Sequence, residues 1–347
     1  MRRPFTAPLV TLLAGLVLLS YPGGAPATES AAGSSAVVIM YHRFGEARYP
    51  TTNVTIEQFE AHLKELKSGS YTVLPLPAII KALKNKTRLA DRTVGISIDD
   101  AYLSVYTEAW PRLKKAGFPF TVFVATDPVD QKTPGFMSWD QIKEMADAGV
   151  TIGAHTGSHL HMPKVSREKN LGELDRSLKS YRERLGLTPE IFAYPYGESS
   201  LSVQAMVKDA GFIAAFGQHS GGFDAAADRF DLPRFAMNEN YAGMSRFKLS
   251  VNAVALPAAD LTPADPLIGA HNPPAMGFTL TRGLKGLDRL ACFTSHAGRA
   301  RLERLGERRF EIRTDEPFPT GRTRVNCTLP GPDGRWHWFG RQFYRPQ

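Results

Sequence analysis

The chain has 347 residues, of which 43% are hydrophobic, and its formal net charge is +8. This length and apolar content are sufficient for one large hydrophobic core and a smaller one. The basic balance favours anionic surfaces such as a cell envelope, but the chain has no basic run of the kind that binds nucleic acid.

The N-terminus has the order of a secretory signal peptide. A cationic MRRPF precedes an apolar stretch, which a Pro-Gly-Gly cluster at residues 22–24 interrupts, and an Ala-x-Ala site follows at residues 25–27. We therefore predict a signal peptide over 1–27, a linker over 28–35, and export to the periplasm or the extracellular space. A membrane anchor is the alternative for this N-terminal segment. No other segment of the sequence is apolar enough to cross a bilayer.

Between residues 36 and 256, short β-branched runs alternate with amphipathic segments. Strands are predicted over 35–41, 93–98, 118–126, 150–155, 190–197 and 212–217, and helices over 55–67, 102–117, 138–149 and 166–186. Capping boxes, Thr55 with Gln58 and Ser138 with Gln141, mark two of the helix starts. Repeated strand–helix pairs predict a mostly parallel α/β sheet, as a barrel or a doubly wound sheet, with functional groups at the carboxyl ends of the strands.

The last quarter of the chain has another pattern. Proline-rich residues 257–268 are predicted to be a linker, and residues 269–347 a small antiparallel β-domain that resembles a sandwich. Cys292 and Cys327 are expected to form one structural disulfide there. Trp336 and Trp338 alternate along a strand, and we expect them in the core of the sandwich rather than on a sugar-binding surface.

Four side chains at the predicted strand ends suggest a metal site. Asp99 and Asp100 follow one buried strand, and His155 and His159 follow another. Two imidazoles and one carboxylate form a three-ligand set for a divalent ion, which leaves the second carboxylate free to accept a proton. The alternatives are that the aspartates cap the following helix, or that the histidines are structural.

These motifs resemble those of the polysaccharide deacetylases of carbohydrate esterase family four. The family's Thr-Phe-Asp-Asp motif corresponds to SIDD at 97–100, its His-[Ser/Thr]-x-x-His motif to HTGSH at 155–159, and its Arg-x-Pro-Tyr-Gly motif to AYPYG at 193–197. The resemblance covers residues 36–256 and implies a catalytic domain with a distorted (β/α) barrel of about seven parallel strands.

The resemblance also implies a role for each matching residue. It makes Asp99 the general base and implies that Asp100, His155 and His159 bind a divalent metal, most simply Zn²⁺, with Co²⁺, Mn²⁺ and Ni²⁺ as alternatives. A metal-bound water would attack the acetamide. The third motif supplies Pro195, Tyr196 and Gly197 at the substrate, with the backbone N–H of Tyr196 facing the oxyanion.

The sequence departs from the family pattern in two places. The usual Leu-x-His motif near the end of the domain is missing, and His42 at the end of the first strand is expected to be the general acid. This arrangement is similar to the permuted one of biofilm poly-N-acetylglucosamine deacetylases. A structural role for His42 is the alternative, and His219 is a reserve candidate. Ala193 stands where the family has an arginine, and Arg234 is the best substitute, unless it is only a surface residue.

Aromatic side chains can stack on sugar rings. Trp139, Tyr41 and Tyr196 are therefore candidates for a substrate groove, although Trp139 is also well placed to pack at the start of a helix.

These residues predict a secreted, metal-dependent hydrolase that removes N-acetyl groups from an N-acetylglucosamine-containing polysaccharide or oligosaccharide. An O-acetyl xylan esterase or a small-amide amidase on the same fold is one alternative, and a catalytically inactive carbohydrate-binding protein is another. The expected partner is an N-acetylated glycan, and the sequence indicates no particular oligomeric state.

Overall fold

The computed structural model describes residues 35–347, together with residues 1 and 4. Apart from residues 1 and 4, the predicted signal peptide lies outside the described residues, as does most of the 28–35 linker. None of the helices that the structure describes combines the length and the apolar character that a bilayer crossing requires.

A curled, mostly parallel sheet forms the larger part of the molecule. Its central strands run parallel and lie side by side in the order β1 (Ser35–Tyr41), β5 (Thr93–Asp99), β6 (Thr121–Val124), β7 (Thr151–Ala154), β8 (Ile191–Ala193) and β9 (Ala214–Phe216). The sheet is extended by β4 (Thr72–Val73), β10 (Gly222–Asp224) and β11 (Phe235–Ala236). Every residue of β5 is buried, as expected for a parallel strand covered on both faces.

The segment around β11 links the two ends of this curled sheet. Leu232 bridges to Phe216 at the end of β9, and Phe235 pairs with Ile39 of β1. Strand β10 runs antiparallel to the first half of β1. The predicted distorted barrel is therefore confirmed, and its ring is completed by a short segment rather than by a full strand.

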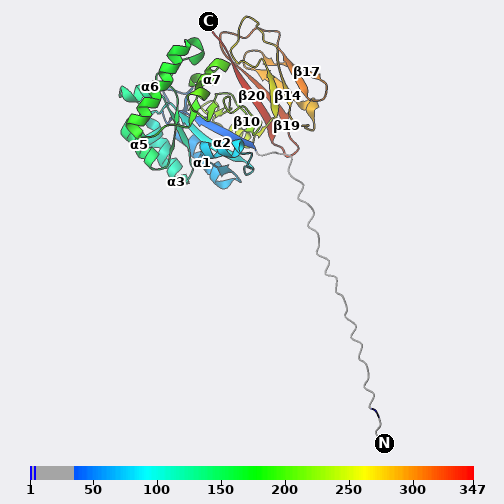
Figure 1. Ribbon diagram of the computed structural model, residues 1–347, viewed down its shortest axis with the longest axis horizontal. Coiled ribbons are helices and arrows are strands. Elements are labelled where there is room, and N and C mark those ends of the chain that lie inside the picture. The colour runs from blue at the N-terminus through cyan, green and yellow to red at the C-terminus, as the bar shows by residue number, and fades with distance from the viewer. Residues whose placement is uncertain (2–3, 5–34) are drawn as a thin grey trace. The chain divides into compact units, whose positions relative to one another are not determined.

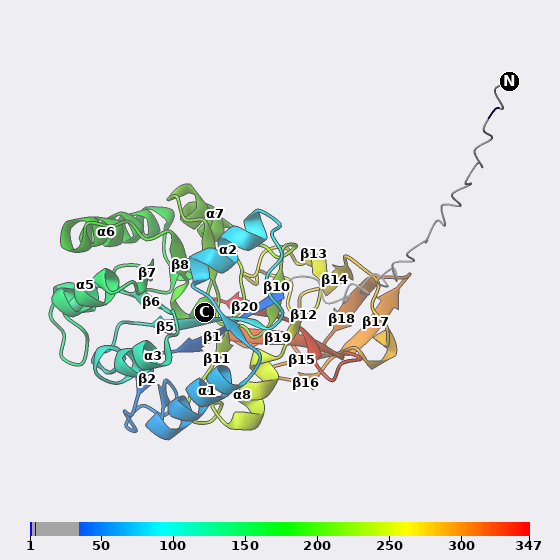
Figure 2. The same cartoon turned by 90° about the horizontal axis from the view of Figure 1, so that it is seen from below.

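Helices cover the outer face of the sheet (Figures 1 and 2). They are α1 (Ile56–Ser68), α2 (Leu76–Lys84), α3 (Trp110–Ala116), α4 (Thr126–Asp130), α5 (Trp139–Asp147), α6 (Arg167–Leu185), α7 (Leu201–Asp209) and α8 (Met244–Val251). Both predicted capping boxes form, at the starts of α1 and α5. Short helical turns are η1 (Val105–Ala109), η2 (Met162–Lys164), η3 (Pro195–Gly197) and η4 (Leu287–Arg289). A short parallel pair, β2 (Arg43–Phe44) and β3 (Asn53–Val54), follows β1.

Two further sheets form the C-terminal part. One contains β12 (Val254–Ala255), β15 (Ala291–Thr294), β16 (Gly298–Arg299), β19 (Gly321–Pro330) and β20 (Trp336–Arg345). The other contains β13 (Ala258–Thr262), β14 (Met276–Leu280), β17 (Arg301–Leu305) and β18 (Arg309–Arg313). A disulfide joins Cys292 of β15 to Cys327 of β19 within the core between these sheets.

The proline-rich stretch at 257–268, predicted to be a linker, contains ordered elements. Part of it forms β13, which pairs with β14, and Ile268 packs into the core of the C-terminal part. The reason is that Leu256, Ile268 and neighbouring apolar residues supply side chains to that core despite the prolines. In addition, β12 pairs with β20, so the chain enters the C-terminal sheet before the predicted boundary.

The long hairpin of β19 and β20 has two different faces. Val325, Cys327 and Phe343 point into the core of the C-terminal part, whereas the alternate residues face the barrel. A Cβ on Gly340 would collide with the carbonyl oxygen of Ser220, which shows how closely β20 approaches the barrel.

The core position expected for the two tryptophans is therefore wrong. Trp336 is 38% exposed, and Trp338 packs edge-on against Phe235 of the barrel. Both lie on the face of β20 that points away from the sandwich core.

Candidate active site

The carboxyl ends of four strands, together with the residue that precedes β11, bring the candidate residues together. Asp99 is the last residue of β5, and His42 and His155 directly follow β1 and β7. The η3 turn follows β8, and Arg234 directly precedes β11. Parallel strands end at one edge of a sheet, so side chains far apart in the sequence meet there.

Asp100, His155 and His159 form a group that can hold a metal ion. Their nearest ligand atoms lie within 4.8 Å of one another. Asp100 Oδ1 is 3.4 Å from His155 Nε2 and 3.3 Å from His159 Nε2. Both Asp100 Oδ1 and His155 Nε2 are buried without a hydrogen-bond partner, which is costly unless a further group satisfies them. Two nitrogens and one oxygen of this kind suit a divalent transition metal, so the residues fit the implied ion.

The surrounding backbone orients these three side chains. His155 Nδ1 lies 2.7 Å from the carbonyl oxygen of Ala193, so that its Nε2 points toward Asp100. Asp100, His159 and Tyr196 all have positive φ angles, of 76°, 58° and 59°. Such a conformation is costly for residues other than glycine and is often retained at functional sites.

The charge states also suit metal binding. Burial, followed by the charge of His155, lowers the pKa of His159 to about 4, so this ring is neutral at physiological pH. Burial raises the pKa of Asp100, but the close approach of His155 and of the other nearby imidazoles outweighs it and lowers the pKa below its usual range. A neutral imidazole and an ionised carboxylate are the forms that coordinate metals.

Arg234 holds Asp99 in a bidentate ion pair. Its Nη1 and Nη2 lie 2.6 and 2.8 Å from the two carboxylate oxygens of Asp99, and both side chains are fully buried. Arg234 also donates to the carbonyl of Gly217 and to Ser97 Oγ, at 2.9 and 3.2 Å. Burial alone would raise the pKa of Asp99, but the charges of Arg234 and the nearby histidines lower it. Asp99 is therefore ionised and fixed in orientation.

Arg234 reaches this position because of the barrel's closing segment. The family's usual arginine would sit at Ala193 on β8, whereas Arg234 enters from the residues that link β9 to β1. The same carboxylate is thus approached from a different strand.

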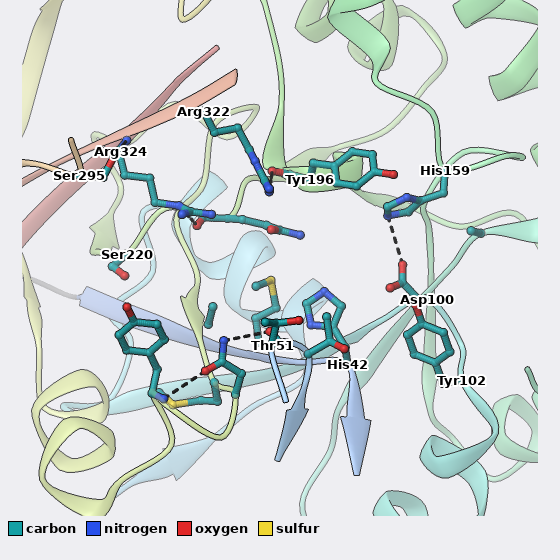
Figure 3. A pocket seen from close by; sticks show the side chains of 18 of the residues that line it. His42, Thr51, Asp100, Tyr102, His159, Tyr196, Ser220, Ser295, Arg322 and Arg324 are labelled. Atoms are coloured by element: carbon teal, nitrogen blue, oxygen red, sulfur yellow. Dashed lines mark hydrogen bonds and ion pairs between the residues drawn. The ribbon is translucent and has the colours of Figure 1, made fainter. Parts of the chain in front are cut away.

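His42 also lies near the carboxylate of Asp99. Its Nε2 is 4.0 Å from Asp99 Oδ2, and 13% of its side chain is exposed. His42, Asp100, His159 and Tyr196 all line one pocket, so His42 is open to a ligand while Arg234 is not (Figure 3).

The η3 turn contains the three residues of the third motif. The Tyr196 ring lies edge-on to His159, with 4.4 Å between ring centroids, and stacks on His161 at 4.0 Å. Pro195 and Gly197 are buried on either side of it. Gly197 has φ of 68°, and a Cβ there would collide with the backbone nitrogen of Gln218, so the turn requires glycine.

The pocket has a volume of about 750 Å³ and two kinds of wall. The barrel supplies His42, Asp100, His159 and Tyr196, whereas the C-terminal part supplies Ser295, Arg322, Arg324, Asn326 and Trp338. A volume of this size accommodates a few sugar rings or a drug-sized ligand.

Other candidates lie elsewhere. Trp139 is not a lining residue; its Nε1 donates to Asp130 and its ring packs edge-on against Tyr181, so the expected sugar-stacking role is not supported. Tyr41 is buried, and its hydroxyl lies 2.9 Å from His62 Nδ1, so it belongs to the core rather than to a groove. His219 is buried beside a separate small cavity.

Sequence reasoning missed the contribution of the C-terminal part. Gln342 Nε2 donates to the backbone oxygen of Tyr196 at 2.9 Å, and Arg322 Nη1 reaches the same oxygen at 3.3 Å. The signal was the alternation of polar and apolar residues in RTRVNC, at 322–327. A polar strand face is normally assigned to solvent, but here it is turned toward the barrel.

Comparisons with known proteins agree with this geometry. A family model described as "Polysaccharide deacetylase" matches residues 86–215. A poly-beta-1,6-N-acetyl-D-glucosamine N-deacetylase of Staphylococcus aureus (strain MRSA252) is 24% identical over 233 residues, which cover 60% of this chain and 80% of that protein.

Two solved structures share the fold. The Streptococcus pyogenes deacetylase PplD, in complex with acetate, matches 63% of this chain and 99% of its own at 21% identity, with a TM-score of 0.59. IcaB from Ammonifex degensii matches 63% of this chain and 97% of its own at 26% identity, with a TM-score of 0.55. The motifs, the barrel and these relatives lead to one conclusion: the chain contains a polysaccharide deacetylase domain.

Proposed function

We propose that this protein is a hydrolase that removes N-acetyl groups from an N-acetylglucosamine-containing polysaccharide or oligosaccharide. The observation that carries the proposal is the arrangement of two adjacent carboxylates, of which Asp100 lines the pocket and Asp99 is fully buried. Asp100 stands with His155 and His159, while its neighbour Asp99 is held apart by Arg234. The Staphylococcus aureus relative, named for N-deacetylation of poly-beta-1,6-N-acetyl-D-glucosamine, supports this choice of substrate.

Asp100, His155 and His159 would hold the metal, with Zn²⁺ preferred and Co²⁺, Mn²⁺ or Ni²⁺ as alternatives. When bound, a divalent ion makes water a better nucleophile near neutral pH and polarises a carbonyl group. The chain's own residues bind this ion and place an acetamide beside it.

Asp99 is the proposed general base. Its ionised carboxylate would take the proton of the attacking water, and a positioned base contributes roughly 10²–10⁴-fold to rate. Arg234 makes the carboxylate a weaker base by lowering its pKa, but it keeps Asp99 ionised and in one orientation. This ion pair supports catalysis over the inactive carbohydrate-binding alternative, for which the arginine missing at position 193 was the main argument.

His42 is the proposed general acid. It lies in the pocket wall beside Asp99, where a protonated imidazole would donate to the departing amine. The backbone N–H of Tyr196 is the proposed donor to the developing oxyanion, for which one good donor contributes about 3–4 kcal/mol.

We also propose that the protein acts after export to the periplasm or the extracellular space. The signal-peptide pattern at residues 1–27 supports this location. The Cys292–Cys327 disulfide supports it as well, since such bonds persist in oxidising compartments.

The test is acetate release from a panel of defined glycans, with and without a chelator. We expect release from β-linked N-acetylglucosamine oligomers, loss of release with chelator, and recovery when Zn²⁺ is added back. Release from acetylated xylan but not from N-acetylglucosamine oligomers would instead identify an O-acetyl esterase.

A further inference from the structure

The pocket wall that faces the proposed catalytic residues is cationic. Arg322 and Arg324 lie two residues apart on β19 and therefore project from the same face of the strand. Both line the pocket, and Figure 3 shows them reaching from the C-terminal strands toward the space between Tyr196 and His42. Trp338 and Asn326 complete this wall.

These cations are poorly neutralised by the protein itself. Arg324 donates its Nε to the carbonyl of Gln218 at 3.2 Å, and no carboxylate in residues 35–347 forms an ion pair with it. Burial and then the charge of Arg322 lower the pKa of Arg324. Arg322 is 3.7 Å from Glu198, but that carboxylate is already shared with His161.

Arg246 adds a further positive charge to the same pocket. Its guanidinium lies over the ring of Tyr241, its Nε is buried without a hydrogen-bond partner, and no ion pair within the described chain involves it. The acidic residue among the lining side chains is Asp100, which faces His155 and His159 instead. Like charges held close together are destabilising unless a counter-charge neutralises them. In this pocket, an anionic ligand in the open space would supply that counter-charge.

We propose that Arg322 and Arg324 bind the carboxylate of an acidic sugar, so that the preferred substrate is an N-acetylated glycan carrying carboxylate groups. The inference rests on the proposed deacetylase function and adds the substrate's charge. Guanidinium groups form charge-assisted, frequently bidentate hydrogen bonds with carboxylates. Arg322 also touches the backbone of Tyr196, whose ring adjoins His159, so the acidic sugar would neighbour the sugar that is deacetylated.

The test compares tetrasaccharides of equal length. Tetra-N-acetylchitotetraose, here called chitotetraose, is neutral. A hyaluronan tetrasaccharide carries uronic-acid carboxylates, and a tetrasaccharide of alternating N-acetylglucosamine and N-acetylmuramic acid carries lactyl carboxylates. The quantity measured is the ratio of kcat/KM for each acidic probe to kcat/KM for chitotetraose. Arg324→Gln removes the charge, Arg324→Lys retains it, and Arg299→Gln is the matched control because Arg299 is an exposed arginine of the same sheet.

We expect at least one acidic probe to be preferred by the unmodified protein, and the better probe identifies the source of the carboxylate. Arg324→Gln should lower the ratio roughly tenfold, the scale of one charge-assisted hydrogen bond. Arg299→Gln should largely keep the ratio. Arg324→Lys should keep part of it, because lysine retains the charge but not the bidentate geometry, and added salt should reduce it. A ratio at or below one in the unmodified protein, or an unchanged ratio in Arg324→Gln, would overturn the proposal.

Calorimetric titration with the same probes, in the presence of chelator, separates the two hypotheses. Tighter binding of an acidic probe that Arg324→Gln abolishes, combined with no acetate release from any probe when Zn²⁺ is supplied in place of chelator, would support the carboxylate site and reject the deacetylase function. Acetate release without any preference for acidic probes in rate or binding would support the deacetylase function and reject the carboxylate site.

Discussion

Replacing Arg234 with glutamine tests how the protein maintains a buried base. The change removes both hydrogen bonds to Asp99 and leaves a fully buried carboxylate without its cation. Removing one partner of a buried ion pair costs about 3–5 kcal/mol in the free energy of unfolding. Asp99 can avoid part of this cost by taking up a proton, but it then no longer serves as a base. We therefore expect both stability and acetate release to fall.

The assay combines urea denaturation with kcat/KM for acetate release from chitotetraose. Arg112→Gln is the control, since Arg112 forms ion pairs with Glu60 and Glu108 at the surface, where each pair contributes about 0–1 kcal/mol. Arg234→Gln combined with Asp99→Asn should regain part of the lost stability, because no unpaired charge remains, while staying inactive. Wild-type activity and stability in Arg234→Gln would refute the assigned role of this pair.

Further predictions concern the other side chains and the disulfide. Asp99→Asn should lower kcat by roughly 10²–10⁴-fold while calorimetric Zn²⁺ affinity stays unchanged, because Asp99 is not in the ligand group; equal loss of both would contradict the separation of roles. His42→Gln should lower kcat at least about 100-fold with little effect on urea stability, since His42 lies in the pocket wall; full activity would return the acid role to another group. Replacing Cys292 and Cys327 with alanine should lower the free energy of unfolding by about 4 kcal/mol, from the 35-residue separation that the disulfide closes. Urea midpoints of oxidised and reduced wild type provide the check, and no difference would contradict this estimate.

Much of the barrel could be predicted from the sequence because its signals are local. Buried parallel strands appear as short apolar runs, and capping boxes such as Thr55 with Gln58 mark helix starts. The grouping of Asp100, His155 and His159 followed from one topological rule, that parallel strands end at the same edge.

The C-terminal wall could not be predicted in the same way. The alternation of RTRVNC shows that one face of β19 is polar, but it does not show what that face contacts. Whether Arg324 and Trp338 meet solvent or a pocket depends on packing between distant segments, such as the close approach of Gly340 to Ser220. The same limit applies to Trp139, whose partners Asp130 and Tyr181 lie on other elements.

Arg234 illustrates an intermediate case. Its sequence position suggested a strand end, but its partner depends on how residues before β11 link β9 to β1. The resemblance to the family indicated an arginine beside Asp99, whereas the bidentate geometry required the fold.

The most direct test of the account is the stoichiometry of metal binding, measured by calorimetry with Zn²⁺ on wild type, His159→Ala and the exposed control Arg299→Gln. We predict one bound ion per chain for wild type and the control, with loss of both the ion and acetate release in His159→Ala. Acetate release from a metal-free protein, or an unchanged Zn²⁺ affinity in His159→Ala, would contradict the central claim.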